Sequence, residues 1–525
     1  MKLFSELLES LIYTSSRNAK ITLLKNYFEK AADPDRGIAL AALTGTLHLP
    51  NVTPAVIRKL MSKRVDPVLF SWSYDFVGDL AETTALMWPS NVKSSAWPKL
   101  KDVYSTLMSV KKKEVPGLIS SWLDAMDETG RWALLKLTGG GLRVGVSARL
   151  AKSSLAKFGD IEVAEVEEVW HALEVPFEEL FSWLEGSIPR PSMDHRAVFR
   201  PLMLANPVLE KELLNIKPDD YALEWKWDGI RVQLAANGEE RKLFSRTGDD
   251  ISNSFPEIID ASKFNGVLDG ELLVMKEEKV APFNDLQQRL NRKKISDKLV
   301  LDFPCHVRLY DILFDGEEDL RTHSFRYRRL RLEQFFEEKK LQRMDLSELV
   351  DFKIHSNLSD LHTTCREYGL EGLMLKPWDS LYIAGRPKPG WFKWKRNPLI
   401  IDAVMMYAQR GHGRRSSFYS DFTFGVWWLH EQKTELVPVA KAYFGFTDEE
   451  LKDLDKWVRD NTIKRFGPVR QVATGLVIEL AFDSIHRSKR HKSGVAMRFP
   501  RVHRIRWDKP AEEADWLESL ETFIE

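Results

Sequence analysis

The chain has 525 residues, enough for several domains that each bury a core of their own. It carries 77 basic and 77 acidic side chains, so the overall charge excludes neither nucleic acid nor protein as a partner, and local clusters have to decide. Its two cysteines, Cys305 and Cys365, exclude a four-cysteine zinc site and a disulfide framework, and they favour a reducing cytoplasm. No apolar run is long enough to span a bilayer, so we expect no membrane partner.

Residues 1 to about 190 predict an all-α domain. Apolar residues recur at helical spacing, as in Leu7, Leu8, Leu11 and Ile12. Similar patterns continue through residues 163–173 and, after a break at Pro176, through residues 177–184. Most of these positions indicate core packing and carry no information about function.

A glycine-rich segment at residues 139–146, GGGLRVGV, stands out within the helical region. Glycines such as Gly141 allow close approach of backbone to a ligand, and Ser147 is placed to cap a helix running to about Ala156. The free amides at a helix start attract anions, so Gly141 and Arg143 are candidates for contact with a phosphate backbone. The alternative explanation is a plain turn between two helices.

The linker at residues 186–193, GSIPRPSM, marks a domain boundary through its prolines, glycine and serines. Residues 197–396 then alternate strand and helix signals, which predicts an α+β domain. A third domain follows from residue 397.

The segment Leu223 to Arg231, LEWKWDGIR, predicts a strand that runs into a turn. Side chains alternate along a strand, so Glu224, Lys226 and Asp228 share one face, with Leu223 and the two tryptophans on the other. Lys226 can act as a nucleophile if nearby positive charge or burial favours loss of its proton. The alternative is an edge strand whose exposed lysine forms salt bridges.

Further along, single side chains suit a nucleotide. Arg246 ends a strand and can reach a ribose hydroxyl or a phosphate, while Tyr310 can present its ring to a base. Asp269 and Glu271 share one face of an apolar strand, where two carboxylates need a cation or a donor. Taken singly, a surface arginine and a core tyrosine are the commoner outcomes.

The end of the central region carries an acid and several bases. Glu371 and Lys376 are five residues apart, so strand alternation puts them on opposite faces unless the chain bends at Gly372. Lys393 and Lys395 share a face and suit an α-phosphate, and Arg386 in the preceding loop is a further phosphate ligand.

Residues 397–525 predict a small barrel of the OB kind around one helix. Strand signals lie at residues 399–406, 422–429, 436–444 and 475–482, and Thr447 with Glu450 forms a capping box. Between Arg487 and Lys509 there are nine basic residues and one acid. Arg487, Lys489 and Arg490 are expected to contact DNA phosphates, although a solvated charged face is the alternative.

The ordered segments KWDGIR, FSRTG, LDGELLV, EGLMLK, WFKWK and RWDK resemble those of ATP-dependent DNA ligases, in the covalent nucleotidyltransferase superfamily. The resemblance covers nearly the whole chain and fits the three-domain bacterial and archaeal type. It implies a multidomain α+β protein with a helical DNA-binding domain at residues 1–190. An adenylation domain at 197–396 and an OB-fold β-barrel at 397–525 would follow.

The resemblance implies sealing of nicks in duplex DNA through lysine-AMP and DNA-adenylate intermediates, with ATP and Mg²⁺ as cofactors, in repair, replication or recombination. It implies a monomer that encircles nicked DNA in the cytoplasm, associated with the nucleoid. The resemblance implies that Lys226 is the nucleophile and that the base is contacted by Glu224 and Tyr310. Ribose or phosphate would be bound by Arg231 and Arg246, the ribose by Glu271, and the metal by Glu271 and Glu371. Phosphates would be bound by Arg386, Lys393 and Lys395, and pyrophosphate by Arg506 and Lys509.

Two features depart from the family pattern: Tyr310 replaces the usual phenylalanine, and the loop after Arg386 is one residue longer. An mRNA-capping guanylyltransferase or an RNA ligase shares the lysine motif, but neither is expected to carry the helical domain. An NAD-dependent ligase is disfavoured because two cysteines cannot build its zinc finger. A catalytically silent DNA-binding scaffold is the alternative of another class.

Overall fold

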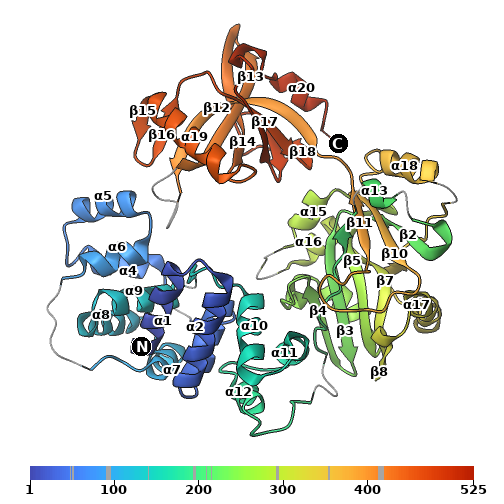
Figure 1. Cartoon of the computed structure of the whole chain (residues 1–525), viewed down its shortest axis with the longest axis horizontal. Helices are drawn as coiled ribbons and strands as arrows, with labels where there is room; N and C mark the ends of the chain where they lie inside the picture. The colour runs from blue at the N-terminus through green and yellow to red at the C-terminus, as the bar shows by residue number, and fades with distance from the viewer. Residues whose placement is uncertain are drawn as a thin grey trace.

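A computed structural model describes the chain from Met1 to Ile524 except positions 48, 50, 51, 90–95, 140, 193–196, 209, 214, 215, 291, 293, 294, 353, 354 and 412–418. Figure 1 shows three regions in chain order: a helical region, a central α+β region and a β-rich region. Among the residues that the structure describes, no helix is both long enough and apolar enough to cross a membrane.

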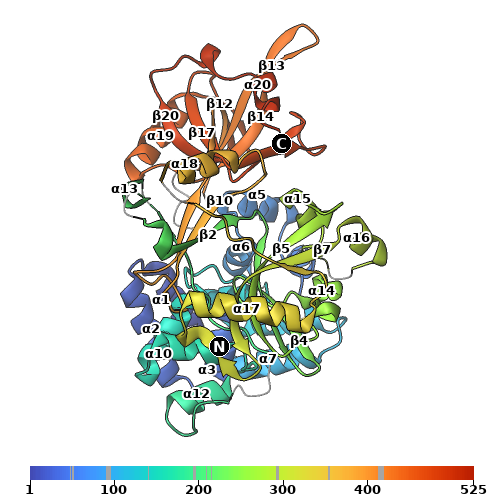
Figure 2. The ribbon, with the colours of Figure 1, turned by 90° about the vertical axis from the view of Figure 1, so that its right-hand side faces the viewer.

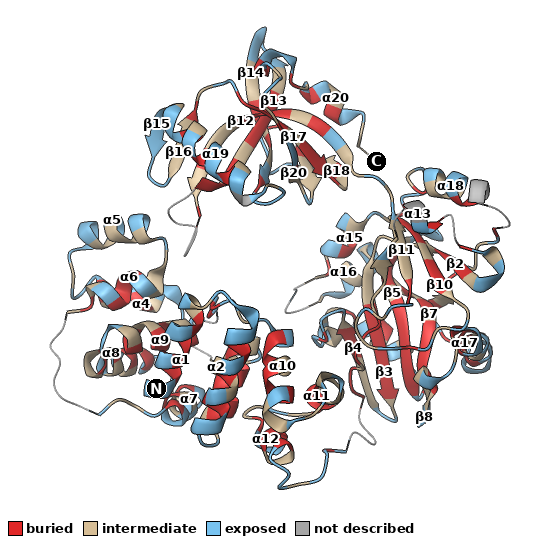
Figure 3. Cartoon of the chain, viewed as in Figure 1, coloured by how far each residue is buried: buried red, intermediate tan, exposed pale blue. Residues whose placement is uncertain are grey.

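The helical region consists of twelve helices among its described residues: α1 (Lys2–Tyr13), α2 (Arg17–Lys30), α3 (Asp35–Thr44), α4 (Pro54–Met61), α5 (Pro67–Val77), α6 (Leu80–Met87), α7 (Leu100–Ser109), α8 (Val115–Ala125), α9 (Glu128–Thr138), α10 (Ala148–Gly159), α11 (Val163–Trp170) and α12 (Glu178–Leu184). One apolar core unites them, with Leu8, Leu24 and Phe28 fully buried. Figure 3 shows the buried stripes of α2 and α10 turned toward their neighbours. The predicted cap at Ser147 is confirmed, because its hydroxyl accepts from Leu150 N at 3.2 Å.

The central region contains two sheets. The smaller has the order β1-β11-β10-β2 and the larger the order β4-β3-β5-β7-β8, with β6 beside β5 and β9 beside β7. Its elements are β1 (Asn206–Pro207), α13 (Glu210–Leu213), β2 (Tyr221–Lys226), β3 (Ile230–Asn237), β4 (Glu240–Ser245), α14 (Pro256–Ala261), β5 (Gly266–Lys276), β6 (Lys279–Val280), α15 (Phe283–Gln287), α16 (Asp297–Asp302), β7 (Cys305–Asp315), β8 (Glu318–Asp319), α17 (Phe325–Lys339), β9 (Met344–Leu346), α18 (His355–Thr364), β10 (Gly372–Pro377) and β11 (Phe392–Lys395).

An apolar core lies between the two sheets and joins Ala222 of β2 to Ala235 of β3, with Trp391 fully buried in it. Helices α14 and α17 pack on the opposite face of the larger sheet, and α17 crosses the front of it in Figure 2. The outer face of the smaller sheet, including Leu223, is covered by α18. The face of β2 that carries Lys226 therefore points into the space between the sheets.

The C-terminal region contains a seven-stranded sheet, in which β12 pairs with β13, β16 and β17, and a separate two-stranded sheet of β18 and β19. Its elements are β12 (Leu399–Arg410), β13 (Tyr419–His430), β14 (Lys433–Ala442), α19 (Asp448–Asp460), β15 (Thr462–Phe466), β16 (Val469–Val472), β17 (Val477–Phe482), β18 (Ser484–Arg487), β19 (Val495–Arg498), β20 (Arg501–Arg506) and α20 (Leu517–Glu521). The predicted capping box at Thr447 is confirmed. The predicted fold class, with helical, α+β and β-rich regions in this order, is confirmed.

Ionic and aromatic contacts join the three regions. Glu168 of α11 binds Arg200 at 3.5 Å and also pairs with Arg321 of the central region. At the other end of the central region, Arg498 of β19 forms an ion pair with Asp228, directly after β2. The central region thus touches both neighbours, and the contact with the barrel lies beside Lys226.

Candidate active site

Lys226 is the last residue of β2, and its amine forms an ion pair with the carboxylate of Glu371. Lys395 approaches the same carboxylate oxygen as Lys226 does, with its Nζ 3.4 Å from Glu371 Oε2. Burial alone would raise the pKa of Glu371, but Lys226 and Lys395 hold that pKa below its usual value. The β2 strand is an edge strand, as the alternative explanation required, yet the Lys226 side chain is only 21% exposed.

Glu371 reaches Lys226 because the backbone bends at Gly372. The φ of Gly372 is +144°, and a Cβ there would lie 2.0 Å from the carbonyl oxygen of Trp394. A bend at Gly372 would have let Glu371 act together with Lys376, but the structure does not pair these two residues. Glu371 pairs with Lys226, whereas Lys376 pairs with Glu224 across the β2–β10 register.

Four basic side chains gather on the same side of the smaller sheet. Lys393 and Lys395 share one face of β11, as predicted, and their strand partners on β10 are Met374 and Gly372. Burial, together with the charges of Arg386 and Arg246, lowers the pKa of Lys393. The structure thus brings the four residues with predicted phosphate roles close enough to repel one another, and a polyanion would relieve that repulsion.

Carboxylates form the opposite wall. Glu271 of β5 faces Lys226 and Glu371, and burial, with the nearby Glu371 carboxylate, raises the pKa of Glu271 to about 7. Burial also raises the pKa of Asp228, although Arg498 opposes that shift. The Oδ1 of Asp228 is buried and has no hydrogen-bond partner.

These three carboxylates fit a hard cation, because a charge placed there would stabilise oxygens that burial now destabilises. Within the described residues no three potential ligands already stand at metal-binding distances. Mg²⁺ commonly keeps several waters and takes one or two carboxylates plus phosphate oxygens, so such a cluster is not required.

Asp269 and Glu271 share a strand face, as predicted, but their side chains have different partners. Asp269 is fully buried, and its carboxylate accepts from Arg231 at 2.7 Å and from the hydroxyl of Tyr382 at 2.6 Å. Arg231 also donates to the carbonyl of Met203 at 2.6 Å. Its terminal nitrogens are therefore bound to protein groups in this arrangement, and the contact with ribose or phosphate that the family resemblance implies for Arg231 stays a prediction.

The residues predicted for the base lie together. Glu224 is fully buried on β2, and Tyr310 of β7 lies beside it, with its ring centroid 4.4 Å from the Nζ of Lys376. Arg231 approaches the same ring at 5.8 Å. Nothing in the sequence pattern predicted a role for Lys376 beside the base.

The barrel contributes Arg498, a residue for which no individual role was predicted. Arg498 pairs with Asp228 and stacks on Phe283 at 4.0 Å. The next residue, Phe499, is 60% exposed and has a φ of +52°, which strains a residue with a Cβ. Arg498 lies in the basic run between Arg487 and Lys509, and Asp228 lies in the lysine motif, so both residues stood in segments of interest. Nothing in the sequence predicted that the two side chains form an ion pair.

The structure does not bring Arg506 and Lys509 to Lys226. Lys509 Nζ lies 2.8 Å from Asp402 Oδ2, and Arg506 lies 3.4 Å from the same oxygen and 2.9 Å from Asp508. Both residues are therefore bound within the barrel in this arrangement. Their predicted contact with pyrophosphate requires the barrel to turn.

The loop that is predicted to bind DNA is hydrogen-bonded to a buried lysine of α2. Arg143 is exposed with a φ of +50°, and Gly141 is exposed two residues earlier. The amine of Lys20, buried on α2, donates to the carbonyl of Val144 at 2.8 Å and to that of Gly145 at 2.9 Å. These two hydrogen bonds tie the loop to α2 and Arg143 is exposed, while the contact of the loop with DNA stays a prediction. Gly140 lies outside the described residues.

The three basic residues predicted to contact DNA from the barrel are exposed at and after β18. Arg487 is 71% exposed on the side chain and forms an ion pair with Glu521 at 3.2 Å. Lys489 and Arg490 are exposed in the turn that leads to β19.

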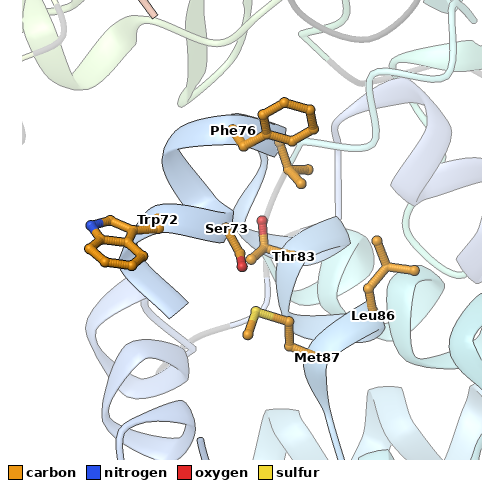
Figure 4. Close-up of a pocket in the computed structure, with 7 residues that line it drawn as sticks. Trp72, Ser73, Phe76, Thr83, Leu86 and Met87 are labelled. Carbon is orange, nitrogen blue, oxygen red and sulfur yellow. The ribbon is translucent and has the colours of Figure 1, made fainter. Parts of the chain in front are cut away.

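An apolar pocket lies between α5 and α6 of the helical region, far in sequence from the residues above (Figure 4). Trp72, Phe76, Leu86 and Met87 line it. It contains no titratable side chain, so it offers no chemistry for nucleotide transfer.

Known proteins match this chain over its whole length. The model of the ATP dependent DNA ligase domain matches residues 202–395, and that of the ATP dependent DNA ligase C terminal region matches residues 415–509. A probable DNA ligase of Koribacter versatilis is 29% identical over 99% of this chain and 96% of its own. DNA ligase 1 of Korarchaeum cryptofilum is 28% identical over 100% of this chain and 98% of its own.

Among solved structures, Pmar-Lig_PreS3 aligns with a TM-score of 0.59 at 17% identity, over 96% of this chain and 99% of that one, which shows the shared fold. The two family models match adjoining parts of one chain in the order that the motifs predict. The chain belongs to the ATP-dependent DNA ligase family.

Proposed function

We propose that this protein uses ATP to seal nicks in duplex DNA, with Lys226 as the residue that carries AMP. The observation that carries the proposal is the position of Lys226. Its amine lies between carboxylates, Glu371 and Glu271, and a basic group that includes Lys395 and Lys393. The two family models and the full-length relatives support the same activity.

In the first step, the amine of Lys226 loses a proton and attacks the α-phosphorus of ATP. The new N–P bond replaces the bond to the β-phosphate, and pyrophosphate leaves. Lys393, Lys395, Arg246 and Arg386 stabilise the charge on the phosphates, while Glu371 holds the amine in place until the nucleotide arrives. Catalysis is then mainly placement and charge neutralisation.

We propose that Asp228, Glu271 and Glu371 hold Mg²⁺ when ATP is bound. The unpartnered Oδ1 of Asp228 and the raised pKa of Glu271 both favour a cation there. Mg²⁺ supplies positive charge that stabilises phosphate oxyanions and favours the neutral form of the nearby lysine. Glu371 would then exchange its bond to Lys226 for one to the metal.

In the second step, the 5′-phosphate at the nick attacks the phosphorus of lysine-AMP, which frees Lys226. In the third, the 3′-hydroxyl attacks the 5′-phosphorus, and AMP leaves as the phosphodiester forms. The helical region and the basic surface of the barrel bind the duplex through phosphate contacts, so affinity should fall steeply with salt. We propose a monomer that encircles the duplex in the cytoplasm, in keeping with its two buried free thiols.

The proposal is tested with a labelled nicked duplex, ATP and Mg²⁺. Sealing is expected with the wild-type chain and should be lost in Lys226→Ala. Lys298→Ala removes an exposed lysine on α16 of the same region and should seal at the wild-type rate. Replacement of ATP by GTP, or of nicked DNA by nicked RNA, should give little product. Sealing by Lys226→Ala at the rate of the control would refute the assignment.

A further inference from the structure

Lys376 of β10 is buried in an enclosed site behind the predicted base position. Only 1% of the residue is exposed, and its Nζ lies 2.6 Å from Glu224 Oε2. Three aromatic rings surround the same amine: Tyr310 at 4.4 Å, Trp391 at 4.6 Å and Phe325 at 4.9 Å from Nζ to ring centroid. Such rings stabilise the charged ammonium through their negative faces.

The two carboxylate oxygens of Glu224 differ in their partners. Its Oε2 is bound by Lys376, whereas its Oε1 is buried and has no hydrogen-bond partner. Arg329 approaches Oε1 only to 3.7 Å, because its Nη1 donates to the carbonyl of Ser347 at 2.8 Å. A buried carboxylate oxygen without a donor is costly, so this atom is prepared for an N–H group that the protein itself does not supply.

We propose that Lys376 is a positioning residue that keeps Glu224 ionised and aimed at the base, and so makes the site select a 6-aminopurine nucleotide. The inference rests on the proposed function, since it concerns the nucleotide that reaches Lys226. Lys376 touches neither the phosphates nor the reacting amine, and it acts through Glu224.

The base chemistry follows from the state of that carboxyl group. The exocyclic amine of adenine is a donor and matches an ionised carboxylate oxygen. The 6-keto oxygen of guanine is an acceptor and would repel it. A protonated carboxyl group would reverse the preference, because its O–H donates to the keto oxygen.

Lys376 favours the ionised state, because its ammonium lies 2.6 Å from one carboxylate oxygen of Glu224. Burial raises the pKa of Glu224, and the nearby charge of Lys376 is the largest opposing influence. Arg329 contributes less, and Asp311 adds to the raising effect. Burial raises the pKa of Glu224 even with Lys376 present, so loss of the ammonium would raise that pKa further and favour the protonated carboxyl group, whose O–H no longer prefers a donor.

The test measures kcat/KM for formation of enzyme-AMP with ATP, and compares it with the same constant for purine riboside triphosphate, which lacks the 6-amino group, and for GTP. A hydrogen bond to a charged group predicts a wild-type preference for ATP over purine riboside triphosphate of about 10- to 100-fold. Lys376→Met should reduce this ratio to within about threefold of unity and should raise the relative use of GTP. Lys298→Met, on the surface of α16, should leave the ratio unchanged.

Glu224→Gln should lower the same ratio, and the double variant Glu224→Gln/Lys376→Met should match it, since Lys376 acts only through Glu224. The double variant also removes the unpaired buried charge that could unfold Lys376→Met, so the comparison survives if the single variant does not fold. Equal losses of rate with ATP and purine riboside triphosphate in Lys376→Met would overturn the proposal. So would a further fall in the ratio when Lys376→Met is added to Glu224→Gln.

Failure of this inference is distinguishable from failure of the proposed function. If wild-type protein forms no enzyme-AMP with any nucleotide, the proposed function fails. If enzyme-AMP forms and the nucleotide preference is the same with and without Lys376, only the role of Lys376 fails.

Discussion

Two charged residues on one face of β2 lie in different surroundings, and this difference separates their roles. Glu224 is enclosed by Lys376 and aromatic rings, while Lys226, two residues on, opens toward Glu371 and the basic residues of β11. The surroundings of Glu224 suit an uncharged base, and the surroundings of Lys226 suit a chain of phosphates. A strand can place both because its side chains two residues apart point the same way.

Glu371→Gln tests the metal and amine partner of Lys226. The amide keeps the shape but loses the charge that would bind Mg²⁺, so the rate of enzyme-AMP formation should fall on the order of 100-fold. Excess Mg²⁺ should recover part of the loss if the remaining carboxylates still bind it weakly. The measurement is a Mg²⁺ titration of the adenylation rate.

Glu338→Gln, an exposed carboxylate on α17, is the matched control and should follow the wild-type curve. An unchanged Mg²⁺ dependence in Glu371→Gln would remove that residue from the metal site.

At the scale of single residues, the sequence predicted which side chains share a strand face, but it did not predict which charged side chains pair with one another. The positions of Lys226, Lys393 and Lys395 followed from strand alternation alone. The bond between Arg231 and Asp269 and the enclosure of Lys376 did not, because each depends on residues more than thirty positions apart. Pairings of that kind are set by sheet register, which one sequence does not fix.

At the scale of elements, the loop before α10 owes its shape to a buried lysine on another helix. The two carbonyls that Lys20 binds, on Val144 and Gly145, face inward, and this turns Arg143 outward. A Cβ at Gly145 would lie 2.4 Å from that amine, so the glycine is needed for the close approach.

Lys20→Met should therefore weaken DNA binding without touching the nucleotide site. We expect roughly tenfold weaker binding to nicked duplex and a salt slope reduced by about one, as for loss of one phosphate contact. Arg143→Ala should do the same, and the double variant should add nothing further. Formation of enzyme-AMP should stay at the wild-type rate in all three.

Lys25→Met removes a lysine from the same helix that pairs with Glu29, and it should leave binding unchanged. If Lys20→Met binds the nick with wild-type affinity and salt slope, the loop does not depend on this lysine.

Helix and strand positions were the most predictable feature of the chain. The capping box at Thr447 and the cap at Ser147 each came from local chemistry and are present. The expected helix at residues 163–173 ends earlier, at Trp170. The role of Lys20 gave no local signal, since a lysine beside Ile21 and Leu24 is ordinarily a solvated position on the rim of a core.

At the scale of the whole molecule, the helical region is packed against the turn that carries Arg246. The ring of His171 lies 4.7 Å from that of Phe199 and against Gly248, where a Cβ would lie 2.3 Å from the imidazole. Burial, reinforced by the charge of Lys152, lowers the pKa of His171 to about 3. The contact therefore requires a neutral imidazole.

Acid should weaken this contact. The folded-state pKa lies below the unfolded value of about 6.5, so the contribution to stability is complete above pH 6.5 and is lost as the pH falls toward 3. By pH 5 the loss is at most about 2 kcal/mol, because each pKa unit is worth about 1.4 kcal/mol. Small-angle scattering should show a larger radius of gyration at pH 5 than at pH 7.5.

His171→Gln cannot gain a proton and should show a smaller change between these two pH values, while His430→Gln in the barrel should behave as wild type. A pH response that persists unchanged in His171→Gln would place its cause elsewhere.

The barrel presents different residues to Lys226 in different orientations. In this structure Arg498 is at the site and Arg506 is bound to Asp402. We expect Arg506→Ala to slow formation of enzyme-AMP yet leave sealing of pre-adenylated nicks within about threefold of wild type. Arg498→Ala should show the reverse pattern, with sealing of pre-adenylated nicks reduced on the order of tenfold or more. Equal losses in both assays for either variant would contradict two working orientations.

The order of the three regions could be predicted, but their mutual arrangement could not. Its contacts include the ion pairs of Glu168 with Arg200 and of Arg498 with Asp228, and the ring contact of His171 with Phe199. Such contacts leave no periodic pattern in a sequence, and interfaces of this kind allow the regions to move.

The claim on which the account depends is that the amine of Lys226 becomes bonded to AMP. Protein incubated with ATP and Mg²⁺, digested and examined by mass spectrometry, should carry one AMP on the peptide containing Lys226, and none after Lys226→Ala. AMP on another residue, or its absence from wild-type protein that nevertheless seals nicks, would contradict the account.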